Sequence, residues 1–170
     1  TFHDGTLFHA NDVKYSFNRA RAVNSTNAKK YIFAPITNID VFDALTVMIS
    51  LDNARTDFLF NIGLGDAVIV SEKTASENAF NPVGTGPFMF KDWVRGDRIS
   101  LVRNDNYWGD APRLERVDFK IITDPLSAYT AMKAGDIDAF PNYPAPENLF
   151  LFNNDPSYEV IVGLTAGETI

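Results

Sequence analysis

The first half of the chain begins with apolar residues at helical spacing and continues with segments whose apolar composition is typical of short strands. Between residues 10 and 22 they recur at helical spacing and charged residues occupy the opposite face, which predicts an amphipathic helix. Residues 36–51 are rich in branched apolar side chains and are interrupted at residues 42–44, which predicts two short strands joined by a turn. A second helix is expected over residues 55–63, followed by a short buried strand over residues 67–70.

The pattern of the second half predicts a hairpin. Phe88 and Phe90 occupy alternate positions along one expected strand, and Ile99 and Leu101 do so along the next. The Arg95-Gly96-Asp97 segment between them has the residues of a tight turn. These two strands are therefore expected to pair directly.

A helix with its own start and stop residues follows the hairpin. Residues 117–121 alternate as a third strand, and Asp124-Pro125 then places an N-cap residue and a proline at a helix start. Gly135 ends that helix. Three further elements are expected: a strand over residues 137–140, a short helix beginning at Pro146 or Glu147 and ending at Phe152, and a last strand over residues 158–162.

Strands and helices alternate over this second half, so the predicted fold class is α/β, or mixed α+β, with a mixed sheet flanked by helices. Asn81-Pro82 and the Gly84–Pro87 stretch interrupt the pattern with turn-forming residues. We therefore expect a subdomain boundary near residue 80.

Composition narrows the functional classes. The net charge of -7 and pI of about 4.7 argue against a nucleic-acid partner, because phosphates would be repelled. The chain has no cysteine, which excludes disulfides, thiolate metal sites and cysteine nucleophiles. No apolar run approaches the roughly 18 to 20 residues that a membrane-spanning helix requires.

Motifs for chemistry are weak throughout. The Gly84-Thr85-Gly86 triplet lacks the lysine and the following helix of a phosphate-binding loop. Residues 104–115 imitate a calcium loop, but Trp108 occupies a ligand position and Pro112 interrupts the geometry, so Tyr107 and Trp108 are expected to be packed aromatic anchors. The two histidines, His3 and His9, have no metal-binding spacing, and no Gly-x-Ser-x-Gly motif is present. We expect no catalytic site, no metal and no cofactor.

Two long phrases carry a resemblance to a known family. FHDGTLFHANDVKYSFNRA (residues 2–20) resembles the pattern F-x-DG-x-PF-x-A-x-DV-x-x-S-x-x-R of bacterial extracellular solute-binding proteins of family 5, the dipeptide, oligopeptide and nickel receptors of ABC importers. Residues 84–138 resemble the same family's second signature, from GTGPF through RNDNYWG to AGDID. Leu7 replaces the usual proline, and His9 stands where a serine or threonine N-cap is usual.

The resemblance implies a two-lobed receptor that closes on a ligand and performs no chemistry. The chain is much shorter than such receptors, so it resembles an internal fragment of the first lobe, lobe I. Residues 1–80 would belong to the small subdomain of lobe I and residues 81–170 to its main mixed-sheet subdomain, with the second lobe absent. The implied partners are an oligopeptide or dipeptide, or another small solute, and an ABC permease in the inner membrane.

The resemblance also implies a location and an oligomeric state. The parent protein would be periplasmic, or extracellular and tethered to the membrane, with its signal peptide outside this chain. The intact receptor would be a monomer, whereas a fragment with uncovered apolar surface could self-associate.

Six residues are candidates for the wall of the ligand cleft. Two aromatic residues lie between the first helix and the first strand, where the family places aromatic cleft residues, and an aspartate follows a glycine-rich loop. The others lie at or just after the carboxyl end of the expected strand over residues 137–140, where open α/β sheets bind ligands. The candidates are Tyr31, Phe33, Asp66, Phe140, Asn142 and Tyr143. Ordinary packing or solvation is an open alternative for each of them.

Two other functional classes remain open on the sequence alone. A solute-sensing module of the same fold could belong to a regulator, in which case a DNA-binding segment would precede Thr1. An unrelated hydrolase would have to draw on the two histidines and the acidic residues. A transport receptor is the preferred interpretation, because two phrases of one family occur in the correct order.

Overall fold

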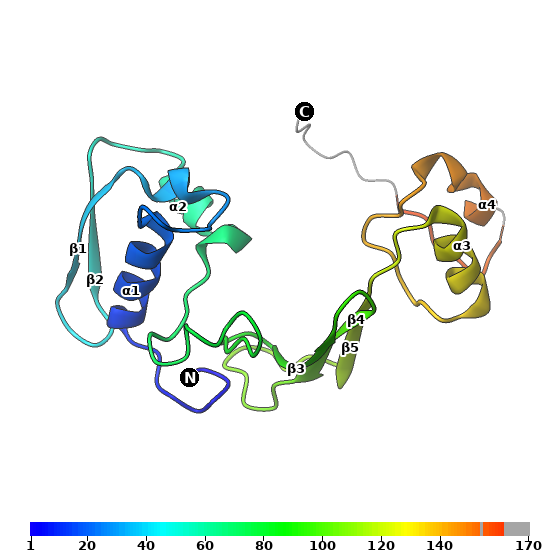
Figure 1. Cartoon of the computed structure of the whole chain (residues 1–170), viewed down its shortest axis with the longest axis horizontal. Helices are drawn as coiled ribbons and strands as arrows, with labels where there is room; N and C mark the ends of the chain where they lie inside the picture. The colour runs from blue at the N-terminus through cyan, green and yellow to red at the C-terminus, as the bar shows by residue number, and fades with distance from the viewer. Residues whose placement is uncertain (154, 162–170) are drawn as a thin grey trace. The chain divides into compact units, whose positions relative to one another are not determined.

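The computed structural model describes residues 1–153 and 155–161. Over this range the chain divides into two compact units (Figure 1). Unit 1 comprises residues 1–94 and 99–119, and unit 2 comprises residues 95–98 and the chain from residue 120 onward. The boundary between the two units therefore crosses the β-hairpin near residues 94–99 and does not lie at residue 80. The assignment of residues 1–80 and 81–170 to two subdomains of lobe I is a different statement and stays a prediction.

The first part of unit 1 is a helix packed on a two-stranded antiparallel hairpin, as Figure 1 shows. In the hairpin, Val41 pairs with Val47 beside the turn and Ile36 pairs with Leu51 at the open end. The predicted helix and the two predicted strands are confirmed. The elements in chain order are α1 (Ala10–Arg21), a 3₁₀ turn (Lys30–Phe33), β1 (Ile36–Val41), β2 (Val47–Leu51), α2 (Phe58–Ile62) and a second 3₁₀ turn (Gly65–Ala67).

One apolar cluster holds these elements together. Phe17 of α1 meets Phe33 of the first 3₁₀ turn with ring centroids 5.2 Å apart, and Phe33 is completely buried. Ile39 of β1 is 1% exposed and Phe58 of α2 is also buried in this cluster. Burying side chains of this size contributes about 1.5–3 kcal/mol each, so this cluster is the main source of stability in the first part of unit 1.

The start of α1 explains how a histidine can stand at its N-cap. The Asp12 carboxylate accepts a hydrogen bond of 2.8 Å from the backbone N–H of His9, which is one half of a capping box. The Asp12 side chain also lies in the first turn, where the helix dipole favours a negative charge. The missing serine or threonine cap is thereby partly replaced.

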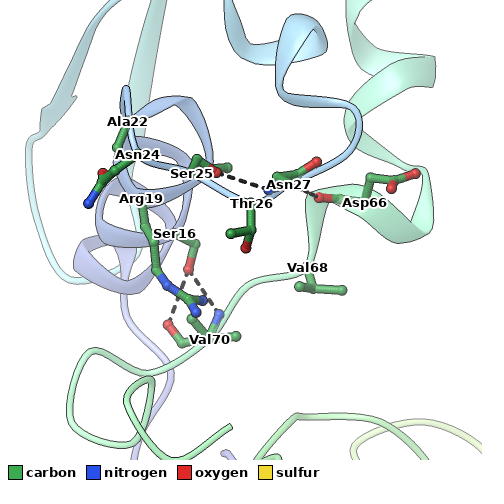
Figure 2. A pocket seen from close by; sticks show the side chains of 11 residues that line it. Ser16, Arg19, Ala22, Asn24, Ser25, Thr26, Asn27, Asp66, Val68 and Val70 are labelled. Atoms are coloured by element: carbon green, nitrogen blue, oxygen red, sulfur yellow. Dashed lines mark hydrogen bonds between the residues drawn. The ribbon is translucent and has the colours of Figure 1, made fainter. Parts of the chain in front are cut away.

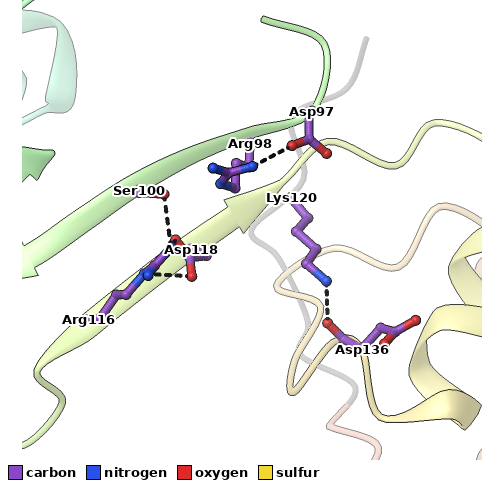
Figure 3. Close-up of polar contacts among 7 residues, drawn as sticks. All are labelled: Asp97, Arg98, Ser100, Arg116, Asp118, Lys120 and Asp136. Atoms are coloured by element: carbon purple, nitrogen blue, oxygen red, sulfur yellow. Dashed lines mark hydrogen bonds and ion pairs between the residues drawn. The ribbon is translucent and has the colours of Figure 1, made fainter. Parts of the chain in front are cut away.

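The rest of unit 1 is built on a sheet with the order β3-β4-β5. Its strands are Phe88–Val94, Arg98–Arg103 and Arg116–Lys120, so all three predicted strands are confirmed. Gly96 in the β3–β4 turn has φ of +79°, a conformation that costs glycine little. Along β5, Arg116 pairs with Asp118 at 2.8 Å and also reaches the Ser100 hydroxyl on β4 (Figure 3).

The two signature phrases meet in unit 1. The His3 backbone N–H donates to the Gly84 carbonyl at 2.8 Å, and the Gly84 N–H donates to Nδ1 of the His3 ring at 3.2 Å. Because Nδ1 accepts, the ring carries its hydrogen on Nε2, which donates to the Gly86 carbonyl at 2.9 Å. Asn104 donates to the same carbonyl at 3.1 Å, and Trp108 donates to the Thr85 carbonyl at 3.1 Å.

One expectation about this region is wrong. Trp108 was expected to be a packed anchor, but it is 75% exposed and contacts Tyr107 and one backbone carbonyl. Neither Gly84 nor Gly86 has a positive φ. The side chain of His3 and the buried side chain of Asn104 hold this stretch, and no left-handed glycine is needed.

Unit 2 is a small helical unit. Helix α3 (Pro125–Ala134) begins where predicted, with the Asp124 carboxylate accepting from the Ser127 N–H at 2.7 Å. It ends at Gly135, whose φ of +78° is left-handed. A 3₁₀ turn (Pro146–Asn148) and α4 (Phe150–Asn153) form the predicted short helix in two pieces. Lys120 closes the loop after α3 by donating to the Asp136 carbonyl at 2.9 Å (Figure 3).

Three predicted strands are absent from the described residues. Residues 67–70 begin within a 3₁₀ turn and continue without strand pairing, and residues 137–140 and 158–161 have no strand assignment; Val162 lies outside the described residues. A strand exists only when a neighbouring strand completes its hydrogen-bond ladder. These three segments have no such neighbour within the described part of the chain. The α/β alternation in the second half is therefore not observed, whereas the mixed α+β class is confirmed.

Candidate ligand-binding surfaces

The three candidates in unit 1 have very different surroundings. Tyr31 is 67% exposed on the first 3₁₀ turn, so its ring is available to a ligand. Phe33, two residues later, is 0% exposed in the apolar cluster and has no surface that a ligand could touch. Asp66 lies in the second 3₁₀ turn, and its half-buried carboxylate pairs with Lys29 at 3.3 Å.

Asp66 also borders a pocket of about 430 Å³, which we call the α1 pocket. Its walls are the second half of α1, the loop over residues 22–27 and the segment over residues 66–70 (Figure 2). The lining residues are Ser16, Arg19, Ala20, Ala22, Asn24, Ser25, Thr26, Asn27, Asp66, Val68 and Val70. The volume lies within the range typical of small-molecule sites.

Backbone-directed hydrogen bonds shape this pocket. The buried Ser16 hydroxyl donates to the Val70 carbonyl at 3.1 Å and accepts from the Val70 N–H at 2.9 Å, which fixes the 66–70 segment against α1. The Asn27 amide donates to the Asp66 carbonyl at 2.7 Å, which fixes the same segment to the 22–27 loop (Figure 2). The pocket is therefore held open by contacts between three separate parts of unit 1.

Unit 2 contains a second pocket, of about 540 Å³, which we call the aromatic pocket. Phe140 and Tyr143 line it, whereas Asn142 is exposed beside it. Phe152 contacts Tyr143 at a centroid distance of 5.6 Å and Tyr158 at 5.1 Å, both in edge-on geometry. Edge-to-face rings of this kind stabilise one another beyond the area they bury.

Tyr143 is the unusual member of this group. Its hydroxyl oxygen is buried and has no hydrogen-bond partner among the described residues. Burial raises the pKa of the Tyr143 phenol, because the phenolate would lose its hydration. A buried hydroxyl without a partner is destabilising until another group meets it.

Unit 2 contains an ion pair between Lys133 and Asp155. Lys133 donates to the Asp155 carboxylate at 2.8 Å and also lies 4.8 Å from the centre of the Tyr158 ring. The hydrogen bond from Lys133, together with bonds from Ser157, lowers the pKa of Asp155 to about 2. The pair ties α3 to the residues that follow α4.

Metal sites and membrane spans have no support in the described part of the chain. No group of three or more histidine and acidic side chains there could hold a metal ion. No helix there is long and apolar enough to cross a membrane.

The sequence reasoning missed most of the α1 pocket. It identified Asp66 but not the polar loop Asn24-Ser25-Thr26-Asn27, which follows directly on α1. The available signal was a run of hydroxyl and amide side chains beside Arg19, a residue of the first signature phrase. Residues 138–140 and 158–161 of the aromatic pocket were expected to be strands, and of these only Phe140 was also expected at a ligand site.

A sequence model of one family covers nearly the whole chain. The model described as bacterial extracellular solute-binding proteins, family 5 Middle, matches residues 1–169. The chain belongs to this family. The predicted resemblance is thereby confirmed. The members of this family are transport solute-binding proteins and not enzymes.

Curated relatives within family 5 are similar over most of the chain. The probable D,D-dipeptide-binding periplasmic protein DdpA of Escherichia coli (strain K12) is 34% identical over 81% of this chain and 28% of its own length. The oligopeptide-binding protein AppA of Bacillus subtilis (strain 168) is 29% identical over 86% of this chain and 28% of its own length. The chain thus spans less than a third of the length of these relatives.

Solved structures of family 5 proteins are similar in fold as well. NikZ from Campylobacter jejuni, in complex with Ni(L-His), matches with a TM-score of 0.81 and 26% identity over 91% of this chain and 32% of NikZ. AppA from Bacillus subtilis, in complex with a nonapeptide, matches with a TM-score of 0.77 and 27% identity over 91% of this chain and 32% of AppA. Together these matches confirm the predicted fold relationship.

Proposed function

We propose that the chain is part of lobe I of a receptor that captures a peptide or similar small solute and delivers it to the permease of an ABC importer. The observation that carries the proposal is the family match over residues 1–169. It is supported by relatives named for oligopeptides, D,D-dipeptides and glutathione. In this assignment residues 1–80 belong to the small subdomain of lobe I and residues 81–170 to its main subdomain.

The proposed mechanism is ligand capture by closure of two lobes. The closed form binds ligand better than the open form, so ligand shifts the receptor towards the closed state that the permease recognises. The receptor acts outside the cytoplasmic membrane, in the periplasm or tethered to the cell surface. This location follows from the family, whose members are extracellular solute-binding proteins.

The residues that we assign to the ligand wall are the accessible ones among the candidates. Tyr31 offers an exposed ring in unit 1, and Asp66 offers a half-buried carboxylate. In unit 2, Phe140 and Tyr143 line the aromatic pocket and Asn142 is exposed next to it. Phe33 is left out because it is fully buried.

Tyr143→Phe is the sharpest test of the assigned wall. The substitution removes a hydroxyl that has no partner within the described residues, so the fold should lose no internal hydrogen bond. If a ligand provides the partner, affinity for a peptide mixture should fall by about three- to tenfold in calorimetric titration of the full-length parent protein. Tyr15→Phe on α1, which lines neither pocket, is the matched control.

The same titration tests the role of the whole chain. The 170-residue chain alone should bind the peptide mixture at least about a hundredfold more weakly than the parent, because one wall leaves most polar ligand atoms in water. A parent that binds no peptide or similar solute would contradict the proposed function. Equal affinities of chain and parent would contradict the assignment of the chain to one wall only.

A further inference from the structure

The α1 pocket lies wholly within unit 1 and is polar. Seven of its eleven lining residues have hydroxyl, amide or charged side chains, whereas Ala20, Ala22, Val68 and Val70 supply the apolar surface. A pocket of this composition favours a small polar ligand over an apolar one, because its polar groups lose water on binding and need partners in return.

Some of these polar groups are already engaged and others are not. Ser16 and Asn27 hold the backbone of the 66–70 segment. By contrast, the side chains of Arg19, Asn24 and Thr26 make no hydrogen bond or ion pair with any of the residues that the structure describes. Figure 2 shows Arg19 extending from α1 towards Val70 and Thr26 pointing into the space between Arg19 and Val68. The unengaged groups are mainly donors, so they favour an acceptor-rich ligand.

The charge of the pocket is set by Arg19. Asp66 is the only acidic lining residue, and its carboxylate pairs with Lys29 at 3.3 Å. In Figure 2 this carboxylate points away from Arg19. The guanidinium of Arg19 therefore has no acidic partner among the lining residues of the pocket, although the net charge of the chain is -7. An arginine without an acidic partner binds a carboxylate through two parallel hydrogen bonds.

We propose that the α1 pocket binds a small carboxylate that carries hydroxyl groups, such as a sugar acid. Arg19 binds the carboxylate, Thr26 and Asn24 meet the hydroxyl groups, and Ala20 and Val68 contact the carbon chain. The site is complete within unit 1, so it extends beyond the proposed capture of ligand between two lobes and does not depend on it.

Gluconate is the probe for this site, because it combines one carboxylate with several hydroxyl groups. We expect saturable binding to the 170-residue chain with Kd of about 1 mM or tighter in calorimetric titration. Two further probes divide the chemistry: sorbitol has the hydroxyl groups without the charge, and hexanoate has the charge without the hydroxyl groups. Each should bind at least about tenfold more weakly than gluconate. If sorbitol or hexanoate binds as tightly as gluconate, the proposed ligand class is wrong.

Arg19→Gln should weaken gluconate binding by about tenfold or more, because a charge-assisted pair is lost. Arg113→Gln makes the same change of charge on an exposed arginine outside the pocket and should leave the affinity within about twofold. Equal effects of the two substitutions would overturn the site, since they would show attraction by overall charge alone. Thr26→Val, which keeps the charge and the side-chain shape, should weaken gluconate by about three- to tenfold.

Backbone amide shifts in NMR spectra locate the bound gluconate independently of the variants. Shifts confined to residues 16–27 and 66–70 would support the site, and shifts elsewhere would overturn it. Thermal unfolding of each variant should match that of the unsubstituted chain, because the Arg19 and Thr26 side chains are exposed and make no hydrogen bond or ion pair within the described residues. Peptide binding by the parent tests the proposed function separately, so failure of either result leaves the other intact.

Discussion

The carbonyl of Gly86 accepts hydrogen bonds from two side chains that come from different parts of the sequence. Nε2 of His3 donates at 2.9 Å and Nδ2 of Asn104 donates at 3.1 Å. A carbonyl oxygen has two lone pairs, so each donor can be removed while the other remains. We therefore predict that His3→Ala and Asn104→Ala destabilise unit 1 by more together than the sum of their separate effects.

The contacts set the expected magnitudes. His3→Ala removes the bond to Gly86 and also the acceptor of the Gly84 N–H, and two net hydrogen bonds correspond to about 1–3 kcal/mol. Asn104→Ala removes the bond to Gly86 and the acceptor of the Asn106 N–H, at a similar cost of about 1–3 kcal/mol. Because Gly86 is only half-buried and water can reach it in part, we expect a coupling free energy of about 0.5–1 kcal/mol.

Urea unfolding followed by tryptophan fluorescence measures this coupling, because both tryptophans, Trp93 and Trp108, lie in unit 1. The free energy of unfolding is obtained by linear extrapolation for the unsubstituted chain, the two single variants and the double variant. His9→Ala combined with Asn104→Ala is the matched control, since His9 makes no hydrogen bond to Gly86, and these two changes should be additive. Additivity in the His3 and Asn104 pair would refute the idea of a shared acceptor.

Two further predictions concern an ion pair and an exposed ring. The hydrogen bond from Lys133, with further bonds from Ser157, lowers the pKa of Asp155 to about 2, so the stabilising effect of this carboxylate should be complete above about pH 4 and be lost as the pH falls through about 2. Lys133→Gln should reduce this part of the acid dependence of unit 2, as followed by circular dichroism, and an unchanged dependence would exclude the Lys133–Asp155 pair as a cause. Trp108→Ala should cost only about 0.5–1.5 kcal/mol in urea unfolding, because the ring is 75% exposed and makes one hydrogen bond; a loss of about 3–5 kcal/mol would mean that the ring is buried after all.

Helices and strands that are defined by capping or turn residues close to them in the sequence were predicted well. Helix α3 begins and ends at the predicted residues because Asp124 caps its first turn and Gly135 takes the left-handed conformation at its end. The β3–β4 hairpin was predicted for the same reason, since Gly96 lies in its turn and both strands are adjacent in the chain. Such elements carry their hydrogen-bond partners within a few residues, so a short window of sequence contains the physical cause of the structure.

Elements that need distant partners were predicted poorly. Residues 67–70 have the apolar composition of a strand, but the Ser16 side chain provides hydrogen bonds to Val70 where a neighbouring strand would otherwise do so. Residues 137–140 likewise have strand composition without a ladder partner in the described chain. Apolar composition indicates that a segment will be buried, but it does not show whether a neighbouring strand will be present to pair with it.

The candidate site shows the same limit at the level of single residues. Tyr31 and Phe33 were proposed together because both are aromatic and lie in one short segment. The 3₁₀ turn exposes the first and buries the second, because Phe33 packs on Phe17 of α1. Only the packing partner distinguishes the two rings, and that partner is not adjacent in sequence.

The two signature phrases contact one another in unit 1 through side-chain hydrogen bonds. His3 of the first phrase is hydrogen-bonded to Gly84 and Gly86 of the second, and Asn104 of the second phrase donates to the same Gly86 carbonyl. None of these three contacts uses a side chain that lines either pocket. These hydrogen bonds therefore stabilise the fold of unit 1 and do not determine which ligand is bound. It follows that substitutions at His3 or Asn104 should change stability far more than ligand preference, whereas Arg19 and Tyr143 should do the reverse.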